Sequence, residues 1–380
     1  MGILDKLKVL DISEEKGLLC SKILADMGAD VVRVDRPGLS PARTFANAGK
    51  HSISLDIRTL KGRDLFLRLV KGSSAVIESF DPGYLSSLGL GYRELSGLNP
   101  QLIMASITAY GQTGPLRNFK SSDLVASALG GQAFLCGDPD KPPLKPFGPQ
   151  AYYTACLFAA NGVLLALWQR KASGRGQHID ISVHECVAAT LDQALVRYFY
   201  EGEVTRRQGS LSWNQAFRIF PCRDGYILLS LFQQWETLIE WLGSENMADD
   251  LKDPKYLDAA ERRKDLDHII EVLERWTLYH TADELVELGQ LMHFPWARVS
   301  SIPDVVNSPQ LKERGFFCNG VDPDSGRSYR FPGPPLRMSL TPWNASPHIP
   351  RAGEDNLEIF HHRLGLAEAE IAALRKEGVI

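Results

Sequence analysis

The side chains that most often carry out chemistry are scattered along this sequence. Its six cysteines form no CxxC pair, and its histidines form no His-x-His cluster. Cys20, Cys156 and Cys186 lie within apolar stretches of helical spacing, which indicates buried free thiols. These patterns argue against a structural zinc site and against a disulfide framework, and they favour a reducing compartment. We therefore expect no metal site and a cytoplasmic location.

The other acidic and imidazole candidates each have a structural interpretation. Asp123 stands at the start of a predicted helix, where a carboxylate commonly caps or stabilises the first turn. Asp138 and Asp140 lie in a proline-rich turn and are expected to face solvent. His178 and His184 flank a predicted strand and a predicted helix, as structural histidines often do. No pair of these side chains defines a reaction by its spacing alone.

Composition and charge limit the kinds of ligand that the chain attracts. The 380 residues are 44% hydrophobic and 23% charged, with a formal net charge of -4. Such a chain has no general attraction for nucleic acid, so an anionic ligand must be held by local cations. The longest apolar run, 155–168, is interrupted by Asn161 and Gly162 and is too short to span a bilayer. We expect neither a nucleic-acid partner nor a membrane partner.

Strands and helices alternate through the first half of the chain. The hydrophobic pattern predicts strands at 7–12, 30–35, 52–57, 75–78, 102–107 and 178–182, and helices at 17–28, 59–71, 123–131 and 154–169. Strands separated by helices form a parallel sheet with helices on both faces, so we expect an α/β, Rossmann-like fold. From about residue 208 the pattern changes to a hairpin at 217–231 followed by helices, which indicates a second, smaller α+β domain.

Several phrases occur along nearly the whole chain in a fixed order. They include VLDIS, NAGKHSISLDI, ESFDPGYLSSLGLGYREL, LIMASITAYGQTGP, SSDLVASALGG, GDPDKPP and SGRGQHIDIS. In this order they resemble the family III CoA-transferases, which include formyl-CoA transferases, carnitine CoA-transferases and related acyl-CoA racemases. The resemblance implies a large domain made of residues 1–205 and 326–380, a small domain of residues 206–325, and an interlocked dimer.

The resemblance also implies a site for coenzyme A. It places Arg36 beside the adenosine part of CoA and Lys120 at a CoA phosphate, with Ser79, Phe80 and Leu88 forming the loop around them. An anionic ligand with an apolar arm requires such a mixture of cations, backbone donors and an apolar slot.

The expected CoA loops depart from the family pattern in three places. Ser79 replaces the usual asparagine, and Ser87 replaces an arginine that often follows it. The loop at 13–17 reads SEEKG where the family has small residues and Gly-Pro. Two added carboxylates in this loop are unfavourable to an approaching phosphate.

The nucleophile of the family is an aspartate that lies ten residues before the glycine of a long helix. In this chain the glycine is Gly162, and the count reaches Tyr152. A carboxylate is a nucleophile at neutral pH, whereas a phenol is almost wholly protonated there. The histidine that acts as a base in the racemases is replaced by Ser122. We therefore expect no catalytic residue in this chain.

Two hypotheses remain open. In the first, the chain is a subunit of a CoA-transferase and supports a homologous catalytic subunit, as in the two-gene CoA-transferases that act on benzylsuccinate. Coenzyme A or acyl-CoA is then the substrate, bound by this chain or only by its partner. In the second, the chain forms a homodimer that performs lyase, hydratase or isomerase chemistry on an acyl-CoA, or it binds CoA without catalysis.

Overall fold

The computed structural model describes residues 2–38, 45–212, 217–321, 325–343 and 345–380. The chain divides into two compact units. The first consists of Met1–Ala133, Lys145–Thr205 and Pro309–Ile380, and the second of Phe134–Leu144 and Arg206–Ser308. The second unit shares residues 206–308 with the small domain expected from the sequence, whereas residues 309–321 belong to the first unit.

A six-stranded parallel sheet forms the centre of the first unit. Its strands are β1 (Lys8–Ile12), β2 (Asp30–Asp35), β3 (His51–Ser54), β4 (Ala75–Glu78), β5 (Ile103–Thr108) and β6 (His178–Ser182). They lie in the order β3-β2-β1-β4-β5-β6, which is the strand order of the Rossmann fold. The expectation of a parallel α/β sheet is confirmed. The order reverses between β1 and β4, and the region outside the carboxyl ends of these two strands, where sheets of this order bind ligands, is here called the crevice.

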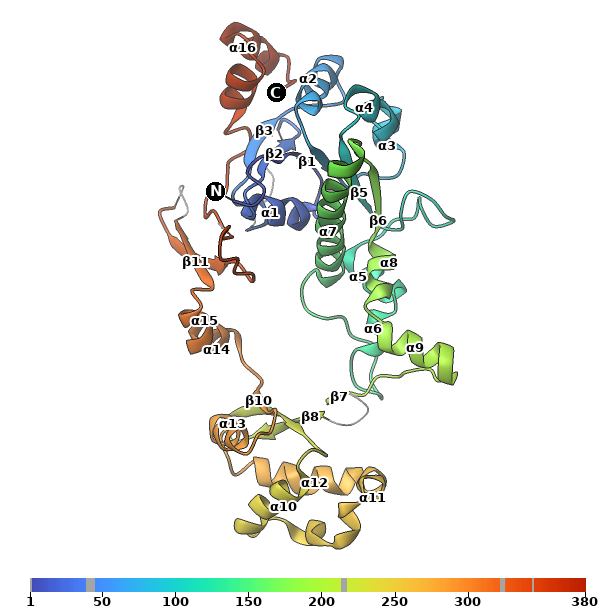
Figure 1. The fold of residues 1–380 in the computed structure, drawn as a ribbon, viewed down its shortest axis with the longest axis vertical. Coiled ribbons are helices and arrows are strands. Elements are labelled where there is room, and N and C mark those ends of the chain that lie inside the picture. The colour runs from blue at the N-terminus through green and yellow to red at the C-terminus, as the bar shows by residue number, and fades with distance from the viewer. Residues whose placement is uncertain (1, 39–44, 213–216, 322–324, 344) are drawn as a thin grey trace. The chain divides into compact units, whose positions relative to one another are not determined.

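Helices cover both faces of the sheet, as Figure 1 shows. Those of the first unit are α1 (Leu18–Asp26), α2 (Leu60–Lys71), α3 (Tyr84–Ser87), α4 (Tyr92–Leu98), α5 (Asp123–Leu129), α7 (Gln150–Ser173), α8 (Val183–Ala189), α9 (Asp192–Glu201), α15 (Pro309–Glu313) and α16 (Glu368–Lys376), with short helices η1 (Phe45–Asn47) and η4 (Glu358–Arg363). Successive strand residues point to opposite faces. Val9 and Val31 therefore pack with α1 and α7, whereas Leu10 and Val32 pack with α2 and α16.

Two elements differ most from the sequence expectation. The third strand ends at Ser54 instead of continuing to Ile57, because the N–H of Asp56 leaves the sheet and donates to Val379 O at 2.7 Å. The long helix α7 begins at Gln150, four residues earlier than expected, and extends to Ser173. By length and composition α7 could cross a membrane, but a core helix passes the same test, and one face of α7 is buried in the first unit.

The C-terminal segment returns to the first unit and covers the β3 edge of the sheet. The carboxylate of Asp355 accepts from the N–H of Ser52 at 2.7 Å and lies 2.9 Å from Nδ1 of His51. Figure 1 shows α16, near the C-terminus, beside α2. A short hairpin of β11 (Phe317–Val321) and β12 (Ser328–Pro332) precedes this segment.

The second unit combines an antiparallel sheet with helices. Its strands are β7 (Leu211–Ser212), β8 (Phe217–Cys222), β9 (Gly225–Ser230) and β10 (Ala297–Arg298). Its helices are α10 (Trp235–Ser244), α11 (Ala259–Lys264), α12 (Leu266–Thr277), α13 (Ala282–Leu291) and α14 (Ile302–Asn307), with α6 (Gln132–Leu135) at the boundary and two short helices, η2 (Asp249–Lys252) and η3 (Pro254–Leu257). The predicted hairpin is present as β8 and β9.

Candidate functional site

The crevice between β1 and β4 is bordered by the loops that follow these two strands. The first loop, 13–17, leads into α1, and the second, 79–83, leads into α3. The backbone N–H of Glu14 donates to the hydroxyl oxygen of Ser79 at 2.7 Å, so the two loops are joined directly. In a sheet of this strand order, this crevice is where a nucleotide ligand binds.

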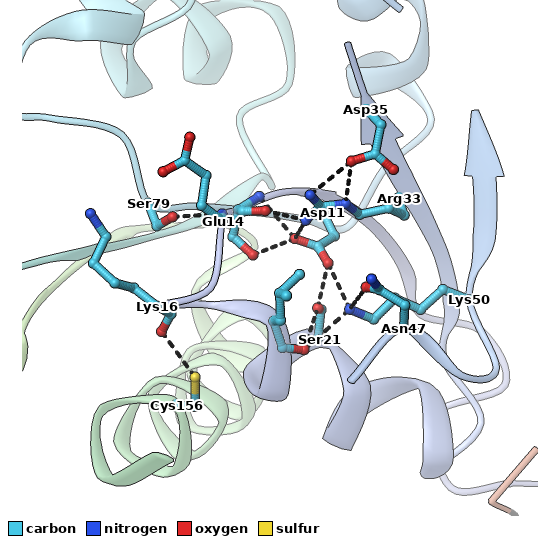
Figure 2. Close-up of polar contacts among 12 residues, drawn as sticks. Asp11, Glu14, Lys16, Ser21, Arg33, Asp35, Asn47, Lys50, Ser79 and Cys156 are labelled. Carbon is cyan, nitrogen blue, oxygen red and sulfur yellow. Dashed lines mark hydrogen bonds and ion pairs between the residues drawn. The ribbon is translucent and has the colours of Figure 1, made fainter. Parts of the chain in front are cut away.

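A buried polar cluster beneath the crevice holds the first loop in place (Figure 2). Its centre is the carboxylate of Asp11, which has no solvent exposure. The Oδ2 atom of Asp11 lies 2.9 Å from Nζ of Lys50 and accepts from the Ser21 hydroxyl at 2.6 Å. The Oδ1 atom accepts from both the N–H and the hydroxyl of Ser13, and the guanidinium of Arg33 donates to the Ser13 carbonyl. The start of the 13–17 loop is therefore fixed from below.

Electrostatics keep this cluster charged although it is buried. Burial alone raises the pKa of Asp11, but the nearby charges of Lys50 and Arg33 and two hydroxyl donors outweigh it and hold the pKa well below its usual range. Burial lowers the pKa of Lys50, and the Asp11 carboxylate opposes that shift. A buried ion pair is stable only when both partners remain and their hydrogen bonds are satisfied.

The first loop is also attached to α7. The thiol of Cys156 donates to the carbonyl oxygen of Lys16 at 3.0 Å. Tyr152 lies one helical turn before Cys156, so the loop contacts α7 one turn beyond Tyr152. The helix that follows the loop begins at Leu18 and has no acidic residue in its first turn, although Glu14 and Glu15 stand in the loop just before it.

Glu78, the last residue of β4, is a buried acid at the floor of the crevice. Its side chain accepts from the N–H of Phe80 at 2.8 Å. Burial raises the pKa of Glu78 to about 7, although the Ser106 hydroxyl, the N–H of Phe80 and the positive charge of Lys16 each lower it. This carboxyl group thus exchanges its proton close to neutral pH, directly below the Ser79–Phe80 backbone.

Three of the residues expected to bind CoA lie together at the second loop. Ser79 is fully buried, and its hydroxyl oxygen is used by Glu14. The half-buried ring of Phe80 lies 4.9 Å from the ring of Tyr84. Lys120 is exposed and reaches the same loop, because its Nζ lies 2.7 Å from Oδ2 of Asp81. That contact raises the pKa of Lys120 and lowers the pKa of Asp81.

Arg36 and Leu88 are the other two residues expected to bind CoA. Arg36 is exposed directly after β2, and Leu88 packs against the core beside α3. Sequence reasoning missed Arg58, whose guanidinium binds Asp56 through contacts of 2.8 and 2.5 Å. Hydrogen bonds from Arg58 hold the pKa of Asp56 below its usual range, and the positive charge of Arg36 adds to this effect. The signal that could have found Arg58 is its place just after a predicted strand.

Tyr152 lies in the first turn of α7 and is only 8% exposed. Its backbone N–H donates to Oδ1 of Asp123 at 3.1 Å, and Oδ2 of Asp123 lies 2.7 Å from Nζ of Lys145. Asp123 thus caps the start of α7 as well as standing in the first turn of α5. Burial raises the pKa of the Tyr152 phenol, and the negative charges of Glu15 and Asp123 raise it further. The phenol therefore keeps its proton at neutral pH.

His178, a candidate from the sequence, and Asp180, which the sequence did not single out, both have structural partners. His178 Nε2 lies 2.8 Å from the Ser106 hydroxyl, and its ring is stacked on Tyr92. The carboxylate of Asp180 accepts from the N–H of Gln112 and so anchors the loop after β5. Among the residues that the structure describes, no cluster of three His, Cys, Asp or Glu side chains has the arrangement of a metal site.

Comparison with known proteins identifies the class to which this fold and crevice belong. The family model described as CoA-transferase family III matches residues 4–356, and the chain belongs to that family. Enzymes of this class use CoA thioesters as substrates.

Named relatives of this chain are similar along nearly its whole length. It is 32% identical to the succinyl-CoA:(R)-benzylsuccinate CoA-transferase subunit BbsE of Thauera aromatica, over 99% of this chain and 97% of the relative. It is 33% identical to the succinyl-CoA--D-citramalate CoA-transferase of Chloroflexus aurantiacus, over 99% and 98%. A crystal structure of a CAIB/BAIF family protein from Brucella suis matches with a TM-score of 0.85 and 29% identity, covering 95% of this chain and 99% of that one.

Proposed function

We propose that this chain is a subunit of a family III CoA-transferase that moves CoA between carboxylic acids, and that a homologous subunit supplies the nucleophile. The observation that carries this proposal is Tyr152, whose buried and protonated phenol stands where the resemblance places the nucleophilic aspartate. A carboxylate attacks the thioester to form a mixed anhydride, and CoA thiolate can then reopen that anhydride. A phenol that keeps its proton is a poor nucleophile for this step.

The CoA thioester binds in the crevice between β1 and β4. The adenosine part lies near Arg36, and a phosphate is held by Lys120, which must exchange Asp81 for the ligand. Phe80 and Leu88 provide apolar contacts, and Ser79 fixes the geometry of the two loops. Both named relatives carry succinyl-CoA in their names, so succinyl-CoA is the first donor to test.

The large apolar surface of the first unit supports an interlocked dimer with the homologous subunit. We expect this dimer to be cytoplasmic. The helix α9 has no buried residue. It exposes Leu195, Val196, Tyr198, Phe199 and Tyr200, and the outer face of α7 exposes Tyr153, Leu157, Phe158, Leu165 and Trp168. Contiguous exposed apolar side chains of this kind are typical of surfaces that bind another protein.

Co-expression with an aspartate-bearing homologue tests this function. We expect the complex to transfer CoA from succinyl-CoA to an acceptor acid, and the lone chain to be inactive. Tyr152→Phe should leave the activity of the complex nearly unchanged, because the phenol takes no part. Tyr152→Asp should give the lone chain measurable transfer, whereas the control Tyr153→Asp, on an exposed neighbour, should not. A wild-type homodimer that transfers CoA by itself contradicts the proposal.

A second candidate is a homodimer with altered acyl-CoA chemistry, such as a lyase, hydratase or isomerase. The observation that favours it is that a protonated phenol near Glu15 and Asp123 can donate a proton. Under this hypothesis Tyr152→Phe abolishes turnover of an acyl-CoA by the lone chain. The same variant therefore separates the two functions.

A further inference from the structure

A row of polar side chains crosses the sheet from the floor of the crevice to the β6 edge. Glu78 on β4 is aligned with Ser106 on β5, and Ser106 is aligned with Asp180 on β6. Aligned residues of neighbouring strands point to the same face of a sheet, and so do residues two positions apart along one strand. Glu78, Ser106 and His178 therefore share one face, and β6 is the last strand on that side of the sheet.

Hydrogen bonds connect the side chains of this row. The Ser106 hydroxyl is hydrogen-bonded to the Glu78 carboxyl group and lies 2.8 Å from Nε2 of His178. Glu78 and Ser106 are buried, with 4% and 1% exposure, whereas His178 is exposed at the sheet edge. The buried acid is thus linked through one hydroxyl to an exposed imidazole. Its proton has a route to solvent that does not require the 79–83 loop to open.

The two ends of the row titrate in different ranges. Burial raises the pKa of Glu78 to about 7, whereas burial lowers the pKa of His178, so the imidazole is neutral where Glu78 titrates. The ring of Tyr92 on α4 stacks on His178 and adds no charge at this pH. The charged groups within electrostatic reach of Glu78, His178 or the Tyr92 ring are Lys16, Asp180 and Arg175.

We propose that Glu78, Ser106 and His178 form a proton relay between the floor of the crevice and solvent. When Glu78 is protonated, its O–H donates to Ser106 Oγ, the Ser106 O–H donates to Nε2 of His178, and Nδ1 carries the imidazole proton. As Glu78 loses its proton, that proton forms a new O–H bond on Ser106, and the original Ser106 proton forms an N–H bond at Nε2. Nδ1 then releases its proton to water. The products are a Glu78 carboxylate and a neutral imidazole that is protonated at Nε2.

Nuclear magnetic resonance of protein containing carbon-13-labelled histidine tests the relay, because the Cδ2 shift differs between the two neutral tautomers of an imidazole. The resonance of His178 is assigned with His178→Gln. In the wild type, His178 should change from the Nδ1–H to the Nε2–H tautomer as pH rises through about 7. In Glu78→Gln and in Ser106→Ala it should keep one tautomer across this range. Ser127→Ala is the matched control, because it removes another hydroxyl of 1% exposure in the same unit, and it should retain the change.

The midpoint of the tautomer change should follow the charge around Glu78. Lys16→Met removes a positive charge that lowers the pKa of Glu78, so the midpoint should move to higher pH. Asp180→Asn removes a negative charge that raises this pKa, so the midpoint should move to lower pH. Midpoints that do not move in these directions overturn the assignment of the change to Glu78.

The experiment needs no ligand, so its result is independent of the proposed CoA-transferase function. A wild-type His178 that keeps one tautomer across neutral pH overturns the relay. A change that persists in Ser106→Ala overturns it as well, because the proton then reaches His178 without the Ser106 hydroxyl. A change that persists in Glu78→Gln assigns the proton to another group and also overturns it.

Discussion

Replacing Glu78 by glutamine should stabilise the protein above neutral pH. The pKa of Glu78 rises from 4.5 to about 7 in the folded protein because the carboxyl group is 4% exposed at the end of β4. The folded protein therefore binds more protons than the unfolded chain between these values, and the contribution of Glu78 to the free energy of unfolding falls as pH rises through this window. At about 1.4 kcal/mol per pKa unit, the full loss is about 3 kcal/mol.

The stability difference between Glu78→Gln and wild type measures this contribution alone. Near pH 4.5 a neutral carboxyl group and an amide have similar shape and polarity, so the two proteins should unfold at similar urea concentrations. By pH 8 the variant should be more stable by about 3 kcal/mol. Far-UV circular dichroism follows unfolding, and amide hydrogen exchange in β4 confines the observation to the first unit. Glu94→Gln, at an exposed position on α4, is the control and should show no such divergence.

A difference between wild type and Glu78→Gln that stays constant from pH 5 to pH 8 would refute the reasoning. It would mean that the carboxyl group titrates at its ordinary pKa. In that case the floor of the crevice is hydrated or held by a stronger positive charge than that of Lys16.

Three further predictions follow from the contacts. Lys50→Met should lower the free energy of unfolding in urea by about 3–5 kcal/mol, because it leaves Asp11 buried without its partner. Adding Asp11→Asn should recover part of that loss. Equal stability of the single and double variants contradicts this prediction. Asp123→Ala should cost about 1 kcal/mol and speed amide exchange at Tyr152, since it removes the cap of α7; unchanged exchange there argues against the cap. Phe199→Glu should shift the proposed dimer to monomer in sedimentation, because Phe199 is 75% exposed on the apolar face of α9; identical sedimentation of both proteins excludes α9 from the interface.

The elements that sequence reasoning located well are those whose pattern is local. The strands at 30–35 and 75–78 are found with the expected bounds, because each is a short apolar run between clear breaks. The start of α7 was placed four residues late, because the apolar pattern weakens there and the cap comes from Asp123, which is 29 residues away. A partner so far along the chain leaves no local signal.

The sequence by itself determined that strands and helices alternate as in an α/β protein with a parallel sheet. It also determined that Tyr152 stands ten residues before Gly162. Only the tertiary structure decided what surrounds these positions. It placed Lys16 and Glu78 at the same crevice, 62 positions apart in the chain, and buried Asp11 against Lys50. Burial and neighbouring charge set the protonation of a side chain, and both depend on contacts between strands that the strand order brings together. The chemistry of this crevice is therefore a property of the folded sheet, whereas the position of Tyr152 ten residues before Gly162 is already visible in the chain.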